Sequence, residues 1–417
     1  MDTIINNLSE SQLSLLYSYN QINSDPKLKE LAEYLNTNPQ EKHKQIKEQT
    51  TTELNKITEQ LKSKKPIKIY IDRVFDIIHS GHFNAIRQAK KLGDICLCGV
   101  NSDEDVLKVK GPTLMNDKER CALAFACKWC DEVGEKTPYT PTLATLDKYN
   151  CDYLSHGDDI PINEKGECCY DEIIHANRMK LFKRTEGVSS TEIMRRLLLC
   201  AKDQIPEVAQ LEEFEKNKKP VMSSLLATSW RIKEFSNNKV PKDGDKIIYI
   251  DGDFDLLHIG HVEALKQAKS LGDFLYVGIH DDANVNKHKG KNYPILNLNE
   301  RVFNLLALKY VDEVIIASPW KVTEDMIKSL NINIVVQGTT PKTEEDYANI
   351  KPEDDPYEIP KKMGIFQTIT SNYDLSNDIL IQRLMKHREA YISKYLNKAK
   401  KDEVFFEGVE NNQIKEI

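Results

Sequence analysis

Residues 69–82 read IYIDRVFDIIHSGH and residues 248–261 read IYIDGDFDLLHIGH, so one stretch occurs twice in this chain of 417 residues. The copies are offset by 179 positions, and 15 of the 25 residues from Tyr70 to Asp94 are identical to those from Tyr249 to Asp273. Each copy has an apolar run rich in β-branched residues, then Asp-x-x-Phe-Asp, then His-x-Gly-His. The chain is therefore predicted to contain a tandem repeat.

Each copy also predicts its own local fold. A helical pattern follows His-x-Gly-His at residues 83–93 and 262–272, and a second apolar run comes after each helix. A strand, a helix and a strand in this order form a parallel crossover unit. We therefore expect two tandem Rossmann-like α/β domains, with parallel sheets flanked by helices. Ligands of such sheets bind at the carboxyl ends of the strands, where helix N-terminal amides attract phosphate.

The histidine pair of the first copy lies where its first strand meets the helix. Gly81 between His79 and His82 allows a ligand to approach the backbone closely. Imidazolium groups at this position could donate hydrogen bonds to phosphoryl oxygens as charge develops on them. A lone histidine is usually structural, but the pairing and the repetition favour a nucleotide site. Zinc is a weaker alternative, because no nearby cysteine or carboxylate pattern completes a ligand set.

The doubled Asp-x-x-Phe-Asp-x-x-His-x-Gly-His stretch resembles the signature of the cytidylyltransferases, which belong to the HxGH nucleotidyltransferases. Residues 184–191, RTEGVSST, resemble the RTxGVSTT block of the same family. The resemblance covers residues 66–200 and 245–400. It implies that CTP and a phosphorylated amino alcohol give a CDP-alcohol and pyrophosphate, with Mg²⁺ accompanying the triphosphate. The tandem arrangement resembles that of the cytidylyltransferases that act in phosphatidylethanolamine biosynthesis. The resemblance therefore implies CTP and phosphoethanolamine as substrates.

The resemblance also implies roles for residues of the first copy. His79, His82 and Lys110 are the expected catalytic residues, and Lys110 precedes Gly-Pro, which predicts a loop within reach of phosphate. Tyr139 is expected near the amino-alcohol end of the substrate, since an ammonium group can lie over an aromatic ring; a packing role is the alternative. The expected CTP-binding residues are Val74, Phe75, Asp76, Gly81, Arg120, His156, Gly157, Asp158, Asp159, Arg184, Thr185, Gly187, Val188, Ser189, Ser190 and Thr191.

One motif in this set can be read without the family. Ser189-x-x-Glu192 is a capping box, which predicts that a helix starts there. Hydroxyl groups, free amides and Arg184 around this start would form a cradle for a triphosphate.

The second copy retains only part of this pattern. It has equivalents of the front of the site at Phe254, Asp255, His258, His261, Lys289 and Arg301. It has no Arg-Thr-x-Gly block before its last helix, and Asp374 and Asp378 stand where a triphosphate tail would lie. We therefore expect the first copy to be catalytic and the second to be degenerate.

Arg73 is the poorest fit within the first copy, because the second copy has Gly252 at this position. Two arrangements are physically open. The guanidinium group could point toward phosphate or solvent, or its bulk could occupy the nucleoside position and block CTP. We expect the first arrangement, because the phosphate-binding features further along the chain are intact.

Composition limits the other classes of function. The net charge of −7 argues against nucleic acid as the main partner. No apolar run approaches the length of a membrane span. The nine scattered cysteines indicate reduced thiols in a cytoplasmic protein; peripheral association with the endoplasmic reticulum and an oligomeric state are left open.

The predicted domain organisation has five parts. It comprises a polar helical or partly disordered extension (1–65), the first cytidylyltransferase domain (66–200), a linker (201–245), a second, degenerate domain (246–400) and a charged tail (401–417). Two other functions remain open. A choline-phosphate enzyme would typically have one copy and a long membrane-binding amphipathic helix, whereas a nucleotide-binding regulator without turnover would follow if Arg73 blocked CTP.

Overall fold

The computed structural model describes residues 65–160, 168–185, 188–200, 229–290, 293–339 and 355–393. The predicted N-terminal extension up to residue 64, the first part of the linker, Gly187 and the charged tail lie outside these residues. No helix among the described residues has the length and apolar character needed to cross a membrane.

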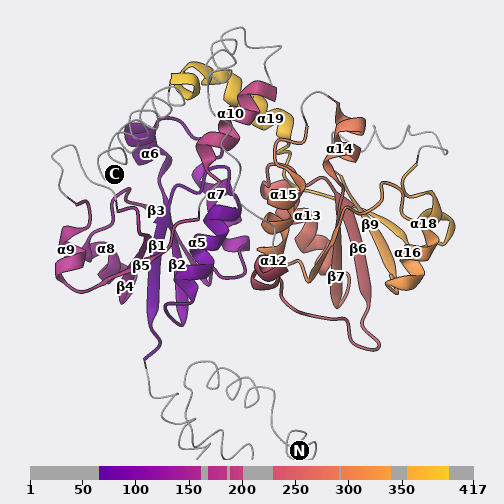
Figure 1. Cartoon of the computed structure of the whole chain (residues 1–417), viewed down its shortest axis with the longest axis horizontal. Helices are drawn as coiled ribbons and strands as arrows, with labels where there is room; N and C mark the ends of the chain where they lie inside the picture. Colours follow the sequence, from indigo (N-terminus) through magenta and orange to yellow (C-terminus); the bar gives the residue numbers. More distant parts are fainter. Residues whose placement is uncertain are drawn as a thin grey trace, which may run out of the picture. The chain divides into compact units, whose positions relative to one another are not determined.

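The first repeat is built on a five-stranded parallel sheet with the strand order β3-β2-β1-β4-β5 (Figure 1). The strands are β1 (Lys68–Arg73), β2 (Ile95–Asn101), β3 (Glu132–Thr137), β4 (Tyr153–Gly157) and β5 (Met179–Phe182). The helices are α5 (Ser80–Lys90), α6 (Asp103–Lys110), α7 (Asp117–Ala126), α8 (Leu143–Lys148), α9 (Asp171–His175) and α10 (Ser190–Cys200).

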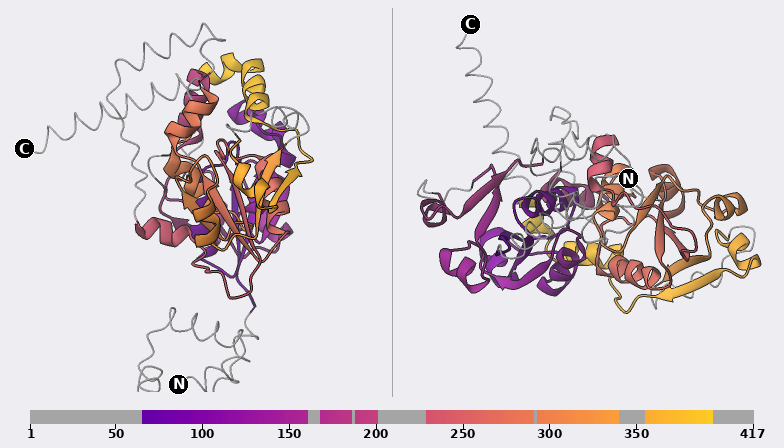
Figure 2. Two further views of the ribbon diagram at one scale, coloured as in Figure 1. Left: turned by 90° about the vertical axis from the view of Figure 1, so that its right-hand side faces the viewer. Right: turned by 90° about the horizontal axis from the view of Figure 1, so that it is seen from below.

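The second repeat has the same topology, with the strand order β10-β9-β6-β7-β8. Its strands are β6 (Ile247–Gly252), β7 (Phe274–Ile279), β8 (Glu313–Ile316), β9 (Ile334–Thr339) and β10 (Phe366–Thr370). Its helices are α13 (Ile259–Lys269), α14 (Asp282–Lys289), α15 (Leu298–Leu306), α16 (Glu324–Ser329), α18 (Glu358–Lys362) and α19 (Asn377–Lys386), while α12 (Ser229–Phe235) precedes the repeat. Helices flank each sheet (Figures 1 and 2), so the predicted fold class is confirmed.

The central strands form because their apolar runs can be covered on both faces. Ile69, Tyr70 and Ile71 of β1 are completely buried, as expected for a parallel strand between two layers of helices. Local signals set the helix starts. In α7, Asn116 Oδ1 accepts from the Glu119 amide at 3.0 Å, and Glu119 Oε2 accepts from the Asn116 amide at 2.9 Å, which completes a capping box.

The two repeats pack against each other through equivalent segments. The Lys128 amide donates to the carbonyl of Ala307 at 2.9 Å, and the Lys309 amide donates to the carbonyl of Ala126 at 3.0 Å. The two amides are 181 positions apart in the sequence, and so are the two carbonyls. The contact therefore has an approximate twofold symmetry, with each repeat giving and receiving the same hydrogen bond.

The last helix of each repeat reaches the other repeat in the same way. Arg196 of α10 contacts Glu300 at 2.7 Å, and Arg383 of α19 contacts Glu119 at 2.6 Å. Phe235 of α12 belongs to the same core, since its ring meets those of Trp129 and Phe303 edge-on at 5.2 and 5.0 Å. The end of the predicted linker is therefore part of the packed core between the repeats.

We expect Leu308→Ala to weaken both repeats together. Leu308 is completely buried and is paired with Cys127 of the first repeat. The substitution should lower the free energy of unfolding by about 2–5 kcal/mol, because it leaves a cavity in this core. Ile316→Ala, at a side chain that is 44% exposed, should cost only about 0.5 kcal/mol. Calorimetry should show one shifted transition for Leu308→Ala; two separate transitions would contradict a shared core.

Candidate active site

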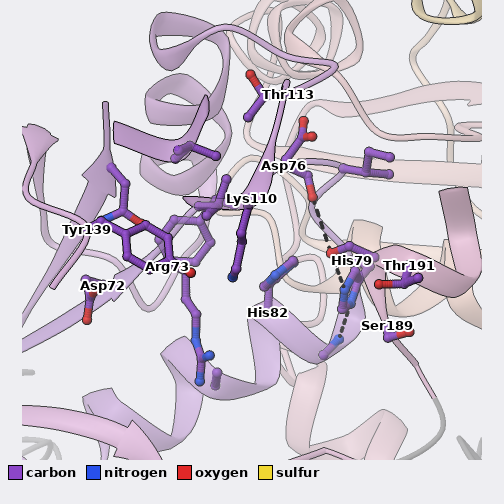
Figure 3. A pocket seen from close by; sticks show the side chains of 18 of the residues that line it. Asp72, Arg73, Asp76, His79, His82, Lys110, Thr113, Tyr139, Ser189 and Thr191 are labelled. Atoms are coloured by element: carbon purple, nitrogen blue, oxygen red, sulfur yellow. Dashed lines mark hydrogen bonds between the residues drawn. The ribbon is translucent and has the colours of Figure 1, made fainter. Parts of the chain in front are cut away.

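A cavity of about 520 Å³ lies at the carboxyl ends of β1 and β4 in the first repeat (Figure 3). Its walls come from the loop after β1, the start of α5, the end of α6 and the segments that follow β3 and β5. The N-terminal turn of α10 closes another side. Ligands of parallel sheets bind at the carboxyl ends of the strands, and the sequence predicted the site at this position.

Most of the predicted site residues of the first repeat line this cavity. They are Val74, Phe75, Asp76, His79, Gly81, His82, Lys110, Tyr139, His156, Asp159, Arg184, Thr185, Val188, Ser189, Ser190 and Thr191. Arg120, Gly157 and Asp158 are not among the lining residues, and Gly187 lies outside the described residues. Lining residues that the sequence reasoning missed include Asp72, Asn101, Thr113, Tyr170 and Tyr391. Of these, only Asp72 had a signal, as the first residue of Asp-x-x-Phe-Asp.

His79 and His82 lie together at the start of α5. Their ring centroids are 4.0 Å apart, and His79 Nδ1 caps the helix by accepting from the Gly81 amide at 3.1 Å. Because Nδ1 is an acceptor, a neutral His79 carries its proton on Nε2, which lies 3.3 Å from Ser190 Oγ. The Nε2–H group is therefore directed toward the start of α10.

The charge of these histidines differs from the sequence expectation. Burial, with help from Arg73 and Arg184, lowers the pKa of His79 to about 3. Burial and the neighbouring His79 likewise lower the pKa of His82 well below its usual value. The expected imidazolium groups are therefore wrong for the free protein, because desolvation opposes a charged ring. Both histidines are therefore neutral near pH 7, so each ring carries one N–H group that can donate to a ligand.

Three cationic side chains line the same cavity: Arg73, Lys110 and Arg184. Lys110 is the last residue of α6, and Gly111 ends the helix with a φ of 83°, so the predicted loop position is wrong by one residue. Its ammonium group lies 5.3 Å from the centre of the Tyr139 ring. Burial and the charge of Arg73 lower the pKa of Lys110. Arg184 pairs with Asp159 at 2.6 Å, so an anionic ligand would be met first by Arg73 and Lys110.

Arg73 faces the site. Its side chain lines the cavity beside Gly157, where an added Cβ would lie 3.6 Å from Arg73 Nη2. Its charge also contributes to the lowered pKa values of His79, His82 and Lys110. The guanidinium group therefore lies in the cavity, and the expectation that it meets phosphate stays a prediction.

Arg120 does not reach the cavity, which corrects the expectation of a nucleotide contact. It is completely buried, and its guanidinium group donates to main-chain carbonyls and to one carboxylate. The acceptors are Val74 O at 2.5 Å, Asn101 O at 2.7 Å, Met115 O at 3.2 Å and Asp103 Oδ1 at 2.6 Å. A buried charge is tolerated when it is hydrogen-bonded in this way. Arg120 thus fixes the strand ends beneath the site.

Two of the predicted aspartates hold backbone in place. The carboxylate of Asp76 accepts from the amides of Leu114 and Met115, both at 3.0 Å, and so ties the segment before α7 to the cavity. Asp158 Oδ1 accepts from the Arg184 amide at 3.0 Å. Asp158 is therefore a support for the Arg184 segment rather than a lining residue, and Gly157 is the end of β4.

The second repeat keeps the scaffold of this site but neutralises its lysine. His258 caps α13 through the Gly260 amide at 3.2 Å, and its ring lies 3.8 Å from that of His261. Phe254 packs against the His261 ring at 5.5 Å between centroids. Lys289, however, forms an ion pair with Asp253, which stands where the first repeat has Val74.

The remaining predicted residues of the second repeat have structural roles. Asp255 accepts from the amides of Ile295 and Leu296 at 2.7 and 2.9 Å, as Asp76 does from its own loop. Arg301 is completely buried and repeats the contacts of Arg120 on main-chain carbonyls. The scaffold is thus preserved, although Lys289 is paired with Asp253.

The buried histidines predict a loss of stability in acid. The native state keeps His79 neutral down to a pKa of about 3, whereas the unfolded chain takes up a proton near pH 6.5. The free energy of unfolding should therefore fall as the pH drops below 6.5, by at most about 2 kcal/mol for this histidine at pH 5.

Urea unfolding between pH 7.5 and pH 5 measures this effect. His79→Asn keeps a cap acceptor but cannot titrate, so its stability should depend less on pH than that of the wild type. His175→Asn, at an exposed histidine, is the control and should keep the wild-type slope. Equal slopes for all three proteins would show that folding does not lower the pKa of His79.

Comparison with known proteins matches both repeats to one family. The sequence profile of the Cytidylyltransferase-like family matches residues 70–196 and 249–357. An ethanolamine-phosphate cytidylyltransferase of Dictyostelium discoideum is 44% identical over 83% of this chain and 98% of its own length. One of Arabidopsis thaliana is 41% identical over 83% of this chain and 87% of its own, whereas choline-phosphate cytidylyltransferase 2 of Arabidopsis thaliana matches only 34% of this chain at 36% identity. The chain belongs to the cytidylyltransferase-like family.

Proposed function

We propose that the chain is an ethanolamine-phosphate cytidylyltransferase, which converts CTP and phosphoethanolamine into CDP-ethanolamine and pyrophosphate. The observation that carries this proposal is the meeting of Arg73, Lys110 and Arg184 with two neutral histidines in one cavity. Such a site suits a polyphosphate whose charge shifts during the reaction. Two relatives that match 83% of the chain, and so both repeats, are ethanolamine-phosphate cytidylyltransferases.

The reaction is a direct displacement at phosphorus. A phosphate oxygen of phosphoethanolamine attacks the α-phosphorus of CTP, and the bond from that phosphorus to the bridging β-phosphate oxygen breaks. The nucleophile is already an anion, so no base is needed, and pyrophosphate leaves with the electron pair. The histidine N–H groups stabilise the oxygens that gain charge, while Lys110 and Arg184 neutralise the leaving group.

The start of α10 provides the cradle for the triphosphate. Ser189 Oγ accepts from the Glu192 amide at 3.2 Å and so begins an eleven-residue helix. Ser190 and Thr191 present hydroxyl groups in the same turn and line the cavity. The free amides of a helix N-terminus add to this attraction for phosphate.

Asp72 supports phosphoethanolamine as the second substrate. Its Oδ1 atom is buried and has no hydrogen-bond partner among the described residues, and burial raises the pKa of its carboxyl group to about 6. Above this pH the carboxylate can accept hydrogen bonds from a primary ammonium group. A trimethylammonium group has no N–H to donate, so phosphocholine would leave Oδ1 of Asp72 without a hydrogen-bond donor. Tyr139 offers its ring from the same cavity.

Mg²⁺ and the cellular compartment belong to the same proposal. Within the described ranges, no group of three or more histidine, cysteine, aspartate or glutamate side chains could hold a metal ion. These residues therefore do not form a cage for Mg²⁺, and we propose that the ion accompanies the triphosphate of CTP. All nine cysteines are free thiols and seven are buried, which fits the reducing environment of the cytoplasm.

Turnover of CTP with phosphoethanolamine and with phosphocholine tests the proposed function. The full chain should form labelled CDP-ethanolamine from CTP and phosphoethanolamine, with a much lower kcat/KM for phosphocholine because of the ammonium contact. Formation of CDP-choline at an equal or higher kcat/KM would contradict the assignment of phosphoethanolamine as the preferred substrate. Binding of CTP without either product would instead support a regulator.

The two histidine pairs should have unequal roles. We expect His82→Ala to lower kcat/KM by at least about 100-fold, or about 2.7 kcal/mol, as for the loss of a donor to a developing oxyanion. His258→Ala removes the helix cap of the second repeat, which is the equivalent of His79, and should leave turnover largely intact. Steady-state kinetics together with circular dichroism measure both effects. A folded His258→Ala protein without turnover would disprove the assignment of catalysis to the first repeat.

A further inference from the structure

The second repeat places one of its side chains in the cavity of the first. Tyr391 belongs to a short helical stretch, residues 388–393, that follows α19. It lines the cavity with Asp76, Ser190 and Thr191, although the cradle lies about 200 positions earlier in the sequence. Tyr391 is only 2% exposed and belongs to the core that joins the repeats.

The hydroxyl group of Tyr391 lacks a hydrogen-bond partner within the described part of the chain. Its oxygen is buried. A buried hydroxyl without a partner is unfavourable, so such groups usually meet a ligand or water. Burial and the nearby carboxylate of Asp76 raise the pKa of Tyr391. The group therefore stays protonated and is available as a donor.

Arg383 fastens α19 to the wall of the first site. Its guanidinium group contacts both carboxylate oxygens of Glu119, at 2.6 and 2.8 Å, and the carbonyl of Leu114 at 2.9 Å. Leu114 is one of the two residues whose amides are held by Asp76. The position of Tyr391 is therefore coupled to the same segment that shapes the cavity. Figure 1 shows α19, in yellow, extending from the second repeat toward the first.

We propose that Tyr391 is a nucleotide-binding residue supplied by the second repeat: its hydroxyl donates a hydrogen bond to the phosphate tail of CTP, and Arg383 is the positioning residue that holds it there. The phosphate tail is the part concerned, because Tyr391 shares this wall with Ser190 and Thr191 at the start of α10. The inference rests on the proposed function, in that CTP is the ligand. It gives the degenerate repeat a role in the site of its neighbour.

Calorimetric titration of the full chain with CTP and Mg²⁺, without phosphoethanolamine, tests this inference apart from turnover. Tyr391→Phe keeps the ring and removes only the donor, so Kd for CTP should rise about 10-fold. KM for phosphoethanolamine and the melting temperature should stay close to the wild-type values. Tyr276→Phe, at a partly buried tyrosine of β7 outside the cavity lining, is the matched control and should bind CTP normally.

Arg383→Met provides a second test. It should also weaken CTP binding, and the double variant Arg383→Met/Tyr391→Phe should bind little worse than Arg383→Met alone, because both changes act through one hydrogen bond. If the wild type binds CTP and Tyr391→Phe binds it equally well, the inference is wrong while the proposed function stands. A lower melting temperature with unchanged Kd would likewise overturn it. A wild type that does not bind CTP would instead disprove the proposed function.

Discussion

A completely buried arginine in each repeat fixes the loops at the carboxyl ends of the strands, where the site of the first repeat is built. Arg120 joins the carbonyls of Val74, Asn101 and Met115, which follow or end three different elements of the first repeat. Arg301 does the same in the second repeat. A guanidinium group has five donors in a rigid plane, so it can hold several carbonyls at fixed separations. It also remains protonated in proteins, so these donors are always present. The loop geometry above it follows from this constraint.

The chemistry of the cavity depends on charges that the scaffold brings together. One cavity is lined by three cationic side chains, those of Arg73, Lys110 and Arg184, and by two histidines that burial keeps neutral. Asp72, Asp76 and Asp159 line the same cavity, and Asp159 pairs with Arg184 at 2.6 Å. A triphosphate would therefore meet Arg73 and Lys110 directly, and would compete with Asp159 for Arg184. Neutral imidazoles can still donate hydrogen bonds, and they do so without adding repulsion among the cations.

The repeats share a scaffold but not a charge pattern. In the second repeat, Asp253 pairs with Lys289, so the lysine that would meet phosphate is already neutralised within the protein. Buried Arg301 and Asp255 nevertheless keep the loops in the same arrangement. Retention of the fold is explained by the shared core, because Arg196 and Arg383 each clamp the opposite repeat. The second repeat thus contributes to packing whether or not its own site is occupied.

The sequence by itself determined the repeat, the parallel crossover units and the position of His79 and His82, because these depend on local periodicity and on a motif at a strand–helix junction. It also gave most of the cavity lining. Only the tertiary structure decided that Arg120 lies beneath the site, that the histidines are neutral and that Tyr391 reaches the cavity. Burial, pKa and contacts across about 200 residues depend on which distant segments converge, and no local pattern records that convergence.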